Sequence, residues 1–209
     1  MGEKHLFLDG EAGRLETYWS GEESASAAAL VLHPHPLYGG SLHNKVVVAC
    51  RNALRSHGLA TLRLNFRGVG LSEGEYADGI GESRDVALAL DYLGEKCPDL
   101  PLILAGFSFG AWLALKIGVE DERVRGILSL GTPVGWGPTD YLQDCRKPRL
   151  FVHGDRDEFC DPELLREEYA KLPEPKELHW IGDADHFFSG KEEKLEARLF
   201  ESLGFLLKG

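Results

Sequence analysis

Short apolar runs alternate with longer segments of helical periodicity along most of this chain. A run of roughly four to eight apolar residues bounded by turn residues indicates a buried strand, whereas apolar positions three and four residues apart indicate a helix. By this pattern, strands are predicted at residues 4–8, 15–19, 28–33, 59–66, 102–105, 124–130, 149–153 and 178–181. Helices are predicted at residues 44–56, 82–93, 109–119, 162–172 and 192–207.

The order of these elements predicts the fold class. Because strands alternate with helices, we expect an α/β fold with a mostly parallel central sheet and helices on both faces. The first two strands follow each other without a helix and are predicted to form an opening pair joined around residues 10–13. A length of 209 residues suits one domain with a sizeable core, so residues 1–209 are predicted to form a single domain.

The charge balance narrows the range of partners. Lys and Arg number 23 against 34 Asp and Glu, which gives a formal net charge of −11. Such a charge repels phosphate backbones and anionic lipid surfaces, so neither nucleic acid nor a membrane is expected as a partner. A preference for neutral or cationic small molecules over polyanionic ones is expected for the same reason. No long apolar segment opens the chain, which predicts a cytoplasmic protein.

Cysteine spacing and one long apolar stretch complete the general picture. The cysteines are widely spaced and form no C-x-x-C pair; they are Cys50, Cys97, Cys145 and Cys160. This spacing matches neither a disulfide framework nor a zinc site, so reduced thiols are predicted. Residues 101–119 are apolar enough to resemble a membrane span, but the glycine-flanked Ser108 divides the stretch into a strand and a helix.

A five-residue motif, Gly106-Phe107-Ser108-Phe109-Gly110, lies where a predicted apolar strand gives way to a predicted helix. This context is typical of a nucleophile elbow, in which a serine occupies a cramped turn and glycines leave room on either side. The serine hydroxyl would then project from the end of the sheet, above the positive end of the following helix. The alternative is a glycine-rich turn whose serine only caps the helix, but the flanking elements favour a catalytic Ser108.

Two loops downstream offer partners for this serine. A serine hydroxyl becomes a strong nucleophile when a histidine takes its proton and an acid orients that histidine. Asp155 and Asp157 follow one predicted strand, and Asp185 and His186 follow the next. Loops at the ends of neighbouring strands can bring their side chains together. We therefore expect His186 to be the general base.

With these motifs, the chain resembles the α/β-hydrolase superfamily, whose triad follows the chain order Ser, Asp, His. The resemblance rests on segments that span nearly the whole chain: H-P-H-P at 33–36, N-F-R-G-V-G-L-S at 65–72, the serine motif, H-G-D-R-D at 153–157 and D-H at 185–186. The set is similar to a small, cap-less bacterial subgroup related to dienelactone hydrolases. Those enzymes have a Cys nucleophile where this chain has Ser108, so their substrate is not carried over.

The resemblance also ranks the candidate acids. In the family pattern H-G-x-x-D, the triad acid corresponds to Asp157, whereas Asp155 lies closer to the strand end and is expected to serve the turn. Asp185 is adjacent to His186, where neighbouring side chains usually diverge. The predicted catalytic residues are therefore Ser108, Asp157 and His186.

Acyl transfer also needs two N–H donors that meet the oxyanion of the tetrahedral intermediate. One donor normally belongs to the residue after the nucleophile, here Phe109, and the other to the loop after the first buried strand. Pro34 and Pro36 in that loop have no N–H, so the backbone N–H of His35 is the predicted second donor. Leu37 is the alternative.

No metal or other cofactor is expected. His33, His35 and His43 lie close together in the sequence, but no carboxylate or cysteine stands at a ligand spacing beside them. Two prolines also stiffen this loop, which further disfavours a metal site.

The segment that begins at Arg67 resembles the start of a dinucleotide-binding loop. Glu73 occupies the position of the required third glycine, so a nucleotide cofactor is not predicted. Gly68 and Gly70 are interpreted as turn residues, and Arg67 is expected to anchor its segment through backbone carbonyls.

The predicted pocket is open. Residues 131–148 separate two strands between which many α/β-hydrolases carry a helical cap, and this length leaves no room for a cap. We expect a shallow pocket bordered by aromatic side chains, namely Tyr38, Trp136, Phe159 and Phe187. Such a site suits small acyl esters or thioesters better than long buried chains.

The predicted activity is that of a carboxylesterase-like serine hydrolase with a small-molecule ester as substrate. Ser108 would attack the carbonyl, His186 would act as base, Asp157 would orient the imidazole, and water would release the acyl group. Two alternatives stay open, a non-catalytic ligand-binding protein of this fold and a peptidase that uses the same residues. A dehalogenase is disfavoured because it needs Asp at position 108. Either a monomer or a homodimer is compatible with the sequence.

Overall fold

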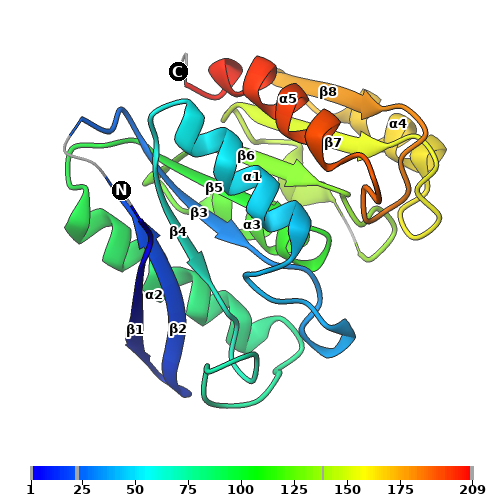
Figure 1. The fold of residues 1–209 in the computed structure, drawn as a ribbon. Helices are drawn as coiled ribbons and strands as arrows, with labels where there is room; N and C mark the ends of the chain where they lie inside the picture. The colour runs from blue at the N-terminus through cyan, green and yellow to red at the C-terminus, as the bar shows by residue number, and fades with distance from the viewer. Residues whose placement is uncertain (1, 22–23, 138, 208–209) are drawn as a thin grey trace.

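A mixed sheet of eight strands organises the part of the chain that the computed structural model describes, residues 2–21, 24–137 and 139–207 (Figure 1). The strands are β1 (Lys4–Gly10), β2 (Gly13–Ser20), β3 (Ala28–Leu32), β4 (Ala60–Leu64), β5 (Leu102–Phe107), β6 (Val124–Leu130), β7 (Arg149–Gly154) and β8 (Lys176–Ile181).

The spatial order of the strands is β1-β2-β4-β3-β5-β6-β7-β8. β1 pairs with β2 and β2 pairs with β4 in antiparallel fashion, whereas all pairs from β4 to β8 are parallel. The predicted opening pair and the mostly parallel sheet are therefore confirmed. Because parallel strands end at the same edge, the loops after β3, β5, β7 and β8 gather there.

Helices cover both faces of the sheet, as predicted (Figure 1). The described helices are α1 (Lys45–Ser56), α2 (Ile80–Lys96), α3 (Phe109–Glu120), α4 (Pro162–Lys171) and α5 (Glu192–Ser202). Val47 of α1 and Leu199 of α5 belong to the core on one face, and Leu90 of α2 and Leu113 of α3 belong to the core on the other. The central strands are buried on both faces, which explains their continuous apolar runs.

Two helices, α2 and α5, differ from their predicted ranges by more than one residue, and α2 extends past its predicted range at both ends. α2 begins at Ile80, before the predicted start, because the buried Glu82 carboxylate accepts the N–H of Gly79 at 2.8 Å and caps the helix. α5 ends at Ser202, and the chain continues as a 3₁₀ turn, Leu203–Phe205. Such tightening is common in the last turn of a helix. The predicted end at 207 was too late because Leu203 and Leu206 stay buried after the α-helix has ended.

No separate cap domain covers the carboxyl edge of the sheet. Between β6 and β7, the described residues 131–137 and 139–148 contain one short 3₁₀ helix, Asp140–Leu142, and otherwise form turns. Within the described ranges, no helix is both long and apolar enough to cross a membrane. The four cysteines are free.

Arg67 is anchored differently from the expectation. Its guanidinium donates to the Asp85 carboxylate of α2 from Nη2 at 2.8 Å and from Nε at 3.1 Å. The prediction of backbone carbonyl partners is wrong because this carboxylate, 18 residues downstream, packs against the loop, a contact that no local pattern reveals. The predicted turn role of Gly68 and Gly70 is confirmed by their φ angles of 75° and 60°.

Candidate active site

The turn between β5 and α3 holds Ser108 in a strained conformation. Its φ of 54° and ψ of −117° lie in a region that residues with side chains rarely adopt. A Cβ on Gly106 would lie 2.1 Å from the backbone O of Gly110, and a Cβ on Gly110 would lie 2.6 Å from the backbone O of Leu32. Neither position has room for a side chain, so close backbone packing against β3 fixes this elbow.

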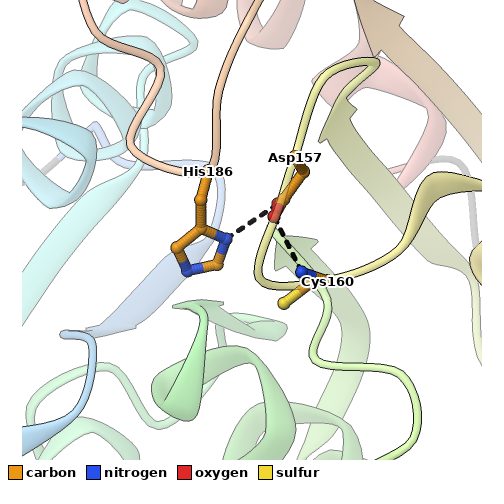
Figure 2. Close-up of side chains that lie close together, drawn as sticks. All are labelled: Asp157, Cys160 and His186. Carbon is orange, nitrogen blue, oxygen red and sulfur yellow. Dashed lines mark hydrogen bonds and ion pairs between the residues drawn. The ribbon is translucent and has the colours of Figure 1, made fainter.

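Three side chains from separate loops meet at the elbow. Oγ of Ser108 lies 3.0 Å from Nε2 of His186, and Nδ1 of His186 lies 2.7 Å from Oδ2 of Asp157. Figure 2 shows the second contact, with the two side chains pointing toward each other. All three residues are nearly buried, with at most 6% of each exposed. In the neutral imidazole, Nδ1–H donates to Asp157 and Nε2 accepts the hydroxyl proton of Ser108.

The surroundings of Asp157 favour its ionised form. Its Oδ1 accepts the backbone N–H groups of Phe159 and Cys160 at 2.9 and 2.8 Å. Burial acts to raise the pKa of Asp157, but the hydrogen bond from His186 and the N–H of Cys160 bring this pKa below its ordinary value. A charged carboxylate at this point can fix the tautomer of His186 and stabilise its cation.

The other two acids considered from the sequence point elsewhere. Asp155 is exposed. Asp185 accepts the backbone N–H of Ser189 at 2.8 Å and so closes the turn that follows His186. The structure therefore brings Asp157 to His186, and neither Asp155 nor Asp185.

A second buried histidine, His153, lies behind the carboxylate at the end of β7. Its Nε2–H donates to the backbone O of Cys160 at 2.7 Å and lies 3.4 Å from Oδ2 of Asp157. Burial lowers the pKa of His153, which keeps its ring neutral beside the carboxylate. Sequence reasoning placed His153 in a strand and gave it no role; its position at the head of the H-G-D-R-D motif is the signal that could have singled it out.

Donor atoms of Asp157, Cys160 and His186 lie within 4.8 Å of one another, close enough to hold a metal ion (Figure 2). The chemistry of the donors disfavours this use. Burial raises the pKa of the Cys160 thiol far above neutral pH, and its Sγ donates to the backbone O of Gly131 at 3.7 Å. Both Asp157 oxygens already accept protein N–H groups. The cluster fits proton transfer between fixed partners better than metal binding.

The two N–H groups predicted to hold the oxyanion belong to residues whose rings are neighbours, with centroids 5.1 Å apart. The N–H of Phe109 opens α3, where the first N–H groups of a helix have no intrahelical partner and the helix dipole favours negative charge. The N–H of His35 makes no hydrogen bond with any residue in the described ranges. Leu37, the alternative donor, is engaged, because its N–H donates to Nδ1 of His35 at 3.2 Å.

His33 fixes the loop that carries His35. Its ring is fully buried, with Nδ1–H donating to the backbone O of Pro34 at 2.6 Å and Nε2 accepting the N–H of Phe66 at 3.1 Å. Both nitrogens of the neutral ring therefore already make hydrogen bonds. A second proton on Nε2 would break the bond that this atom accepts from Phe66. Burial lowers the pKa of His33 from 6.5 to about 4, although the bond to Pro34 acts in the opposite direction.

The low pKa of His33 predicts a stability that falls in acid. The unfolded chain takes up this proton near pH 6.5, whereas the folded protein resists it down to about pH 4. The free energy of unfolding should therefore drop by about 3 kcal/mol as pH falls through this window. Urea denaturation across the window measures the drop. His33→Gln should be less stable at neutral pH and should lack this part of the pH dependence; an equally steep fall in the variant would contradict the assignment.

Two of the four aromatic residues predicted for the pocket rim lie beside His186. The ring centroids of Phe159 and Phe187 are 5.3 and 5.2 Å from that of His186. They are 60% and 42% exposed, so the site opens to solvent on this side.

The other two predicted rim residues lie beside His35. The rings of Tyr38 and Trp136 are 4.7 and 6.5 Å from the His35 ring. Trp136 also borders a cavity of about 240 Å³, whose lining is His35, Tyr76, Asp78, Phe109, Trp112 and Trp136. Sequence reasoning missed Tyr76, Asp78 and Trp112. Tyr76 and Asp78 lie between the N-F-R-G segment at 65–68 and α2, and this position is the signal that could have pointed to them.

These groups together suit acyl transfer. A hydroxyl faces a base at hydrogen-bond distance, an acid orients the base, and the helix that begins directly after the serine presents the N–H of Phe109. This combination activates an oxygen nucleophile and prepares for the negative charge that develops on an attacked carbonyl oxygen.

Comparison with known proteins agrees with the fold. A family described as an alpha/beta hydrolase domain matches residues 27–199. An α/β serine hydrolase homologue from Coxiella burnetii superposes with a TM-score of 0.92 at 34% identity, over 97% of this chain and 98% of its own. A protein from Xanthomonas campestris, described as an α/β serine hydrolase without lid, superposes with a TM-score of 0.89 at 32% identity, over 100% of this chain and 97% of its own.

A more distant relative has a named activity. The mitochondrial palmitoyl-protein thioesterase of Rattus norvegicus is 33% identical over 100 residues, which make up 46% of this chain and 32% of the thioesterase.

Proposed function

Because this chain belongs to the α/β-hydrolase domain family, we propose that it hydrolyses small acyl esters or thioesters through an acyl-enzyme on Ser108. The observation that carries this proposal is the hydrogen-bonded series from Asp157 through His186 to Ser108, at 2.7 and 3.0 Å. In serine acyl transfer these three positions are taken by the acid, the base and the nucleophile. The similarity to a serine hydrolase homologue and to a serine hydrolase without lid supports the same chemistry.

The reaction proceeds in two halves. In the first, His186 takes the proton of Ser108 as Oγ attacks the carbonyl carbon, and the N–H groups of Phe109 and His35 meet the resulting oxyanion. His186 then protonates the leaving oxygen or sulfur, and the acyl group stays on Ser108. In the second half, water attacks the acyl-enzyme, gives its proton to His186, and releases the acid with the proton returned to Ser108.

The two cavities beside α3, the helix that follows Ser108, favour a short acyl group. Behind Trp112, under the segment after β6, the described residues enclose a cavity of only about 30 Å³. This volume holds about one or two water molecules and excludes a long alkyl chain. The cavity beside His35 is larger, at about 240 Å³, but suits a small group as well.

Thioesters are included because of the rat relative, which is named as a palmitoyl-protein thioesterase. Its long acyl chain is not carried over to this protein. The alignment covers less than half of this chain, and the cavity of about 30 Å³ behind Trp112 is too small for a palmitoyl group.

A series of acyl esters and thioesters of increasing chain length tests the expected substrate size. If each added methylene were buried in a groove, about 0.8 kcal/mol would be gained and kcat/KM would rise roughly fourfold per methylene. We expect the highest kcat/KM for acetyl and butanoyl compounds and no such rise for longer chains. A steady increase into the long-chain range would show an acyl groove and contradict the short-chain proposal.

A fluorophosphonate probe separates a serine hydrolase from a ligand-binding protein of the same fold. An activated serine displaces fluoride and becomes covalently phosphonylated, whereas an ordinary surface serine does not react. We expect labelling of the native protein and none of the heat-denatured protein. If the native protein neither reacts with the probe nor hydrolyses any ester, the binding-protein alternative replaces the proposed function. Peptide amides in the same assay address the peptidase alternative.

A further inference from the structure

A cavity lined by aromatic side chains and one carboxylate adjoins the proposed oxyanion donors. It measures about 240 Å³, and its lining consists of His35, Tyr76, Asp78, Phe109, Trp112 and Trp136. Two of these, His35 and Phe109, supply the backbone N–H groups expected to hold the carbonyl oxygen of the substrate. A substituent on that carbonyl, in the acyl or the leaving half, is therefore within reach of the cavity.

Aromatic rings gather around His35 in this cavity. The ring centroids of Tyr76, Phe109 and Trp136 lie 5.0, 5.1 and 6.5 Å from that of His35, and the Tyr76 hydroxyl contacts Nε2 of His35 at 3.3 Å. Trp136 is 50% exposed, which leaves part of its ring open to a ligand. Aromatic faces carry partial negative charge and attract cations.

Asp78 adds a full negative charge to these rings. Its carboxylate makes no hydrogen bond or ion pair with any residue that the structure describes. The backbone at Asp78 has a φ of 52°, and the backbone at the next residue, Gly79, has a φ of 80°. Gly79 packs against Trp112, because a Cβ there would lie 2.5 Å from Cζ3 of that ring. The backbone of Asp78 is thus fixed at the cavity wall, and its exposed carboxylate stays free for a ligand.

The negative charge reaches the middle of the cavity. Burial lowers the pKa of His35, and the carboxylates of Glu82 and Asp78 act in the opposite direction. The same two carboxylates, after burial, raise the pKa of the Tyr76 phenol. The two carboxylates therefore act in favour of a positive charge in this cavity, whereas burial acts against one on the His35 ring.

The positively charged side chains near the cavity do not neutralise the negative charge of Asp78. None of the six lining residues is Lys or Arg. Arg67 is paired with Asp85 at 2.8 Å, and the Lys116 ammonium lies 5.2 Å from the centroid of the Trp112 ring. Trp112 therefore already has a cation beside it, whereas Trp136 has none among the described residues.

We propose that this cavity binds a small alkylammonium group, and hence that the substrate is an ester or thioester that carries one. The aromatic faces would contact the methyl or methylene groups around the nitrogen, and Asp78 would supply the opposite charge. This inference rests on the proposed function for the place of the scissile bond. The binding of the cation itself does not depend on turnover.

Competition by tetramethylammonium during hydrolysis of p-nitrophenyl acetate tests the proposal. The salt is compared with sodium chloride at equal ionic strength, and tert-butanol serves as a neutral probe of similar size. We expect tetramethylammonium to raise KM without changing kcat, and sodium and tert-butanol to have little effect. Inhibition by tetramethylammonium no stronger than by sodium, or equal inhibition by tert-butanol, would overturn the proposal.

Substitutions in the cavity test whether tetramethylammonium binds there. Asp78→Asn and Trp136→Ala should each weaken tetramethylammonium inhibition by about fivefold, and Trp136→Phe should restore part of it because a phenyl face remains. Asp99→Asn makes the same change in net charge on the loop before β5, at the opposite edge of the sheet, and should leave the inhibition constant unchanged. An equal effect of Asp99→Asn would mean that only overall charge matters and would contradict a cation site.

A second readout keeps this inference separate from the proposed function. Tetramethylammonium binding beside Trp112 and Trp136 should change tryptophan fluorescence, and Trp136→Phe should remove part of the change. If p-nitrophenyl acetate is not hydrolysed but this titration saturates, the proposed function fails and the cation site stands. If the ester is hydrolysed and tetramethylammonium neither inhibits nor alters fluorescence, the cation site fails alone.

Discussion

Replacement of Ser108 by alanine is expected to abolish ester hydrolysis while leaving the fold intact. The hydroxyl is the only group at the elbow that faces Nε2 of His186 among the described residues, so its loss removes the nucleophile. In serine triads this change lowers kcat on the order of 10⁶-fold. Initial rates with a short p-nitrophenyl ester measure the loss, and circular dichroism with thermal unfolding confirms that the protein is folded.

The double variant sharpens this result. Because Ser108 and His186 act as one unit, Ser108→Ala combined with His186→Ala should be no slower than Ser108→Ala alone. Additive losses would show that His186 acts independently of the serine. Near wild-type activity in a folded Ser108→Ala protein would remove Ser108 from the mechanism altogether.

Replacement of Asp157 by asparagine should lower kcat by about 10⁴-fold with little change in structure. The amide oxygen can keep the backbone N–H groups that Oδ1 now accepts, at 2.8 and 2.9 Å. The amide N–H₂ would then face Nδ1 of His186 and donate to it, which moves the imidazole proton to Nε2. Nε2 could no longer accept the proton of Ser108, so the variant would hold the base in the wrong tautomer.

Two matched variants distinguish this effect from a general loss of charge. Asp155→Asn and Asp185→Asn remove the same charge from the same two loops, but Asp155 is exposed and Asp185 bonds to the backbone of Ser189. Each should retain turnover within a few-fold of the wild type. A loss near 10⁴-fold in either variant would assign the acid to that residue instead of Asp157.

Much of the fold follows from the sequence because each element has a local signature. The continuous apolar runs at β3 and β5 reflect strands buried on both faces, and the glycines of the serine motif reflect backbone contacts of 2.1 and 2.6 Å that a Cβ would make. The partner of Arg67 was inaccessible to the same reasoning, because Asp85 reaches it only when α2 packs beside the loop.

In the candidate site, too, some residues could be identified from local sequence patterns, whereas others could be identified only from the folded structure. Ser108 and His186 stand in motifs tied to strand ends, so local pattern and chain order are enough to propose them. Asp157 was selected among three acids by the resemblance to the family pattern H-G-x-x-D. The cavity beside His35 depends on how Tyr76 and Asp78, in the loop before α2, meet Trp112 of α3, and none of the three stands in a motif. His33 and His153 appeared as strand residues, since their roles depend on the partners of each ring nitrogen in the folded chain.

The close backbone contacts at the strand ends also bear on how the protein can evolve. A Cβ on Gly110 would meet the backbone O of Leu32 at 2.6 Å, and a Cβ on Gly154 would meet that of Ala184 at 2.3 Å. Any substitution at these positions would displace the reacting groups, so they are closed to variation. The rim aromatics are exposed and lie on loops outside these contacts. New substrate preferences can therefore be selected at the rim, in nature or in a mutant library, while the hydrolytic chemistry beneath is inherited unchanged.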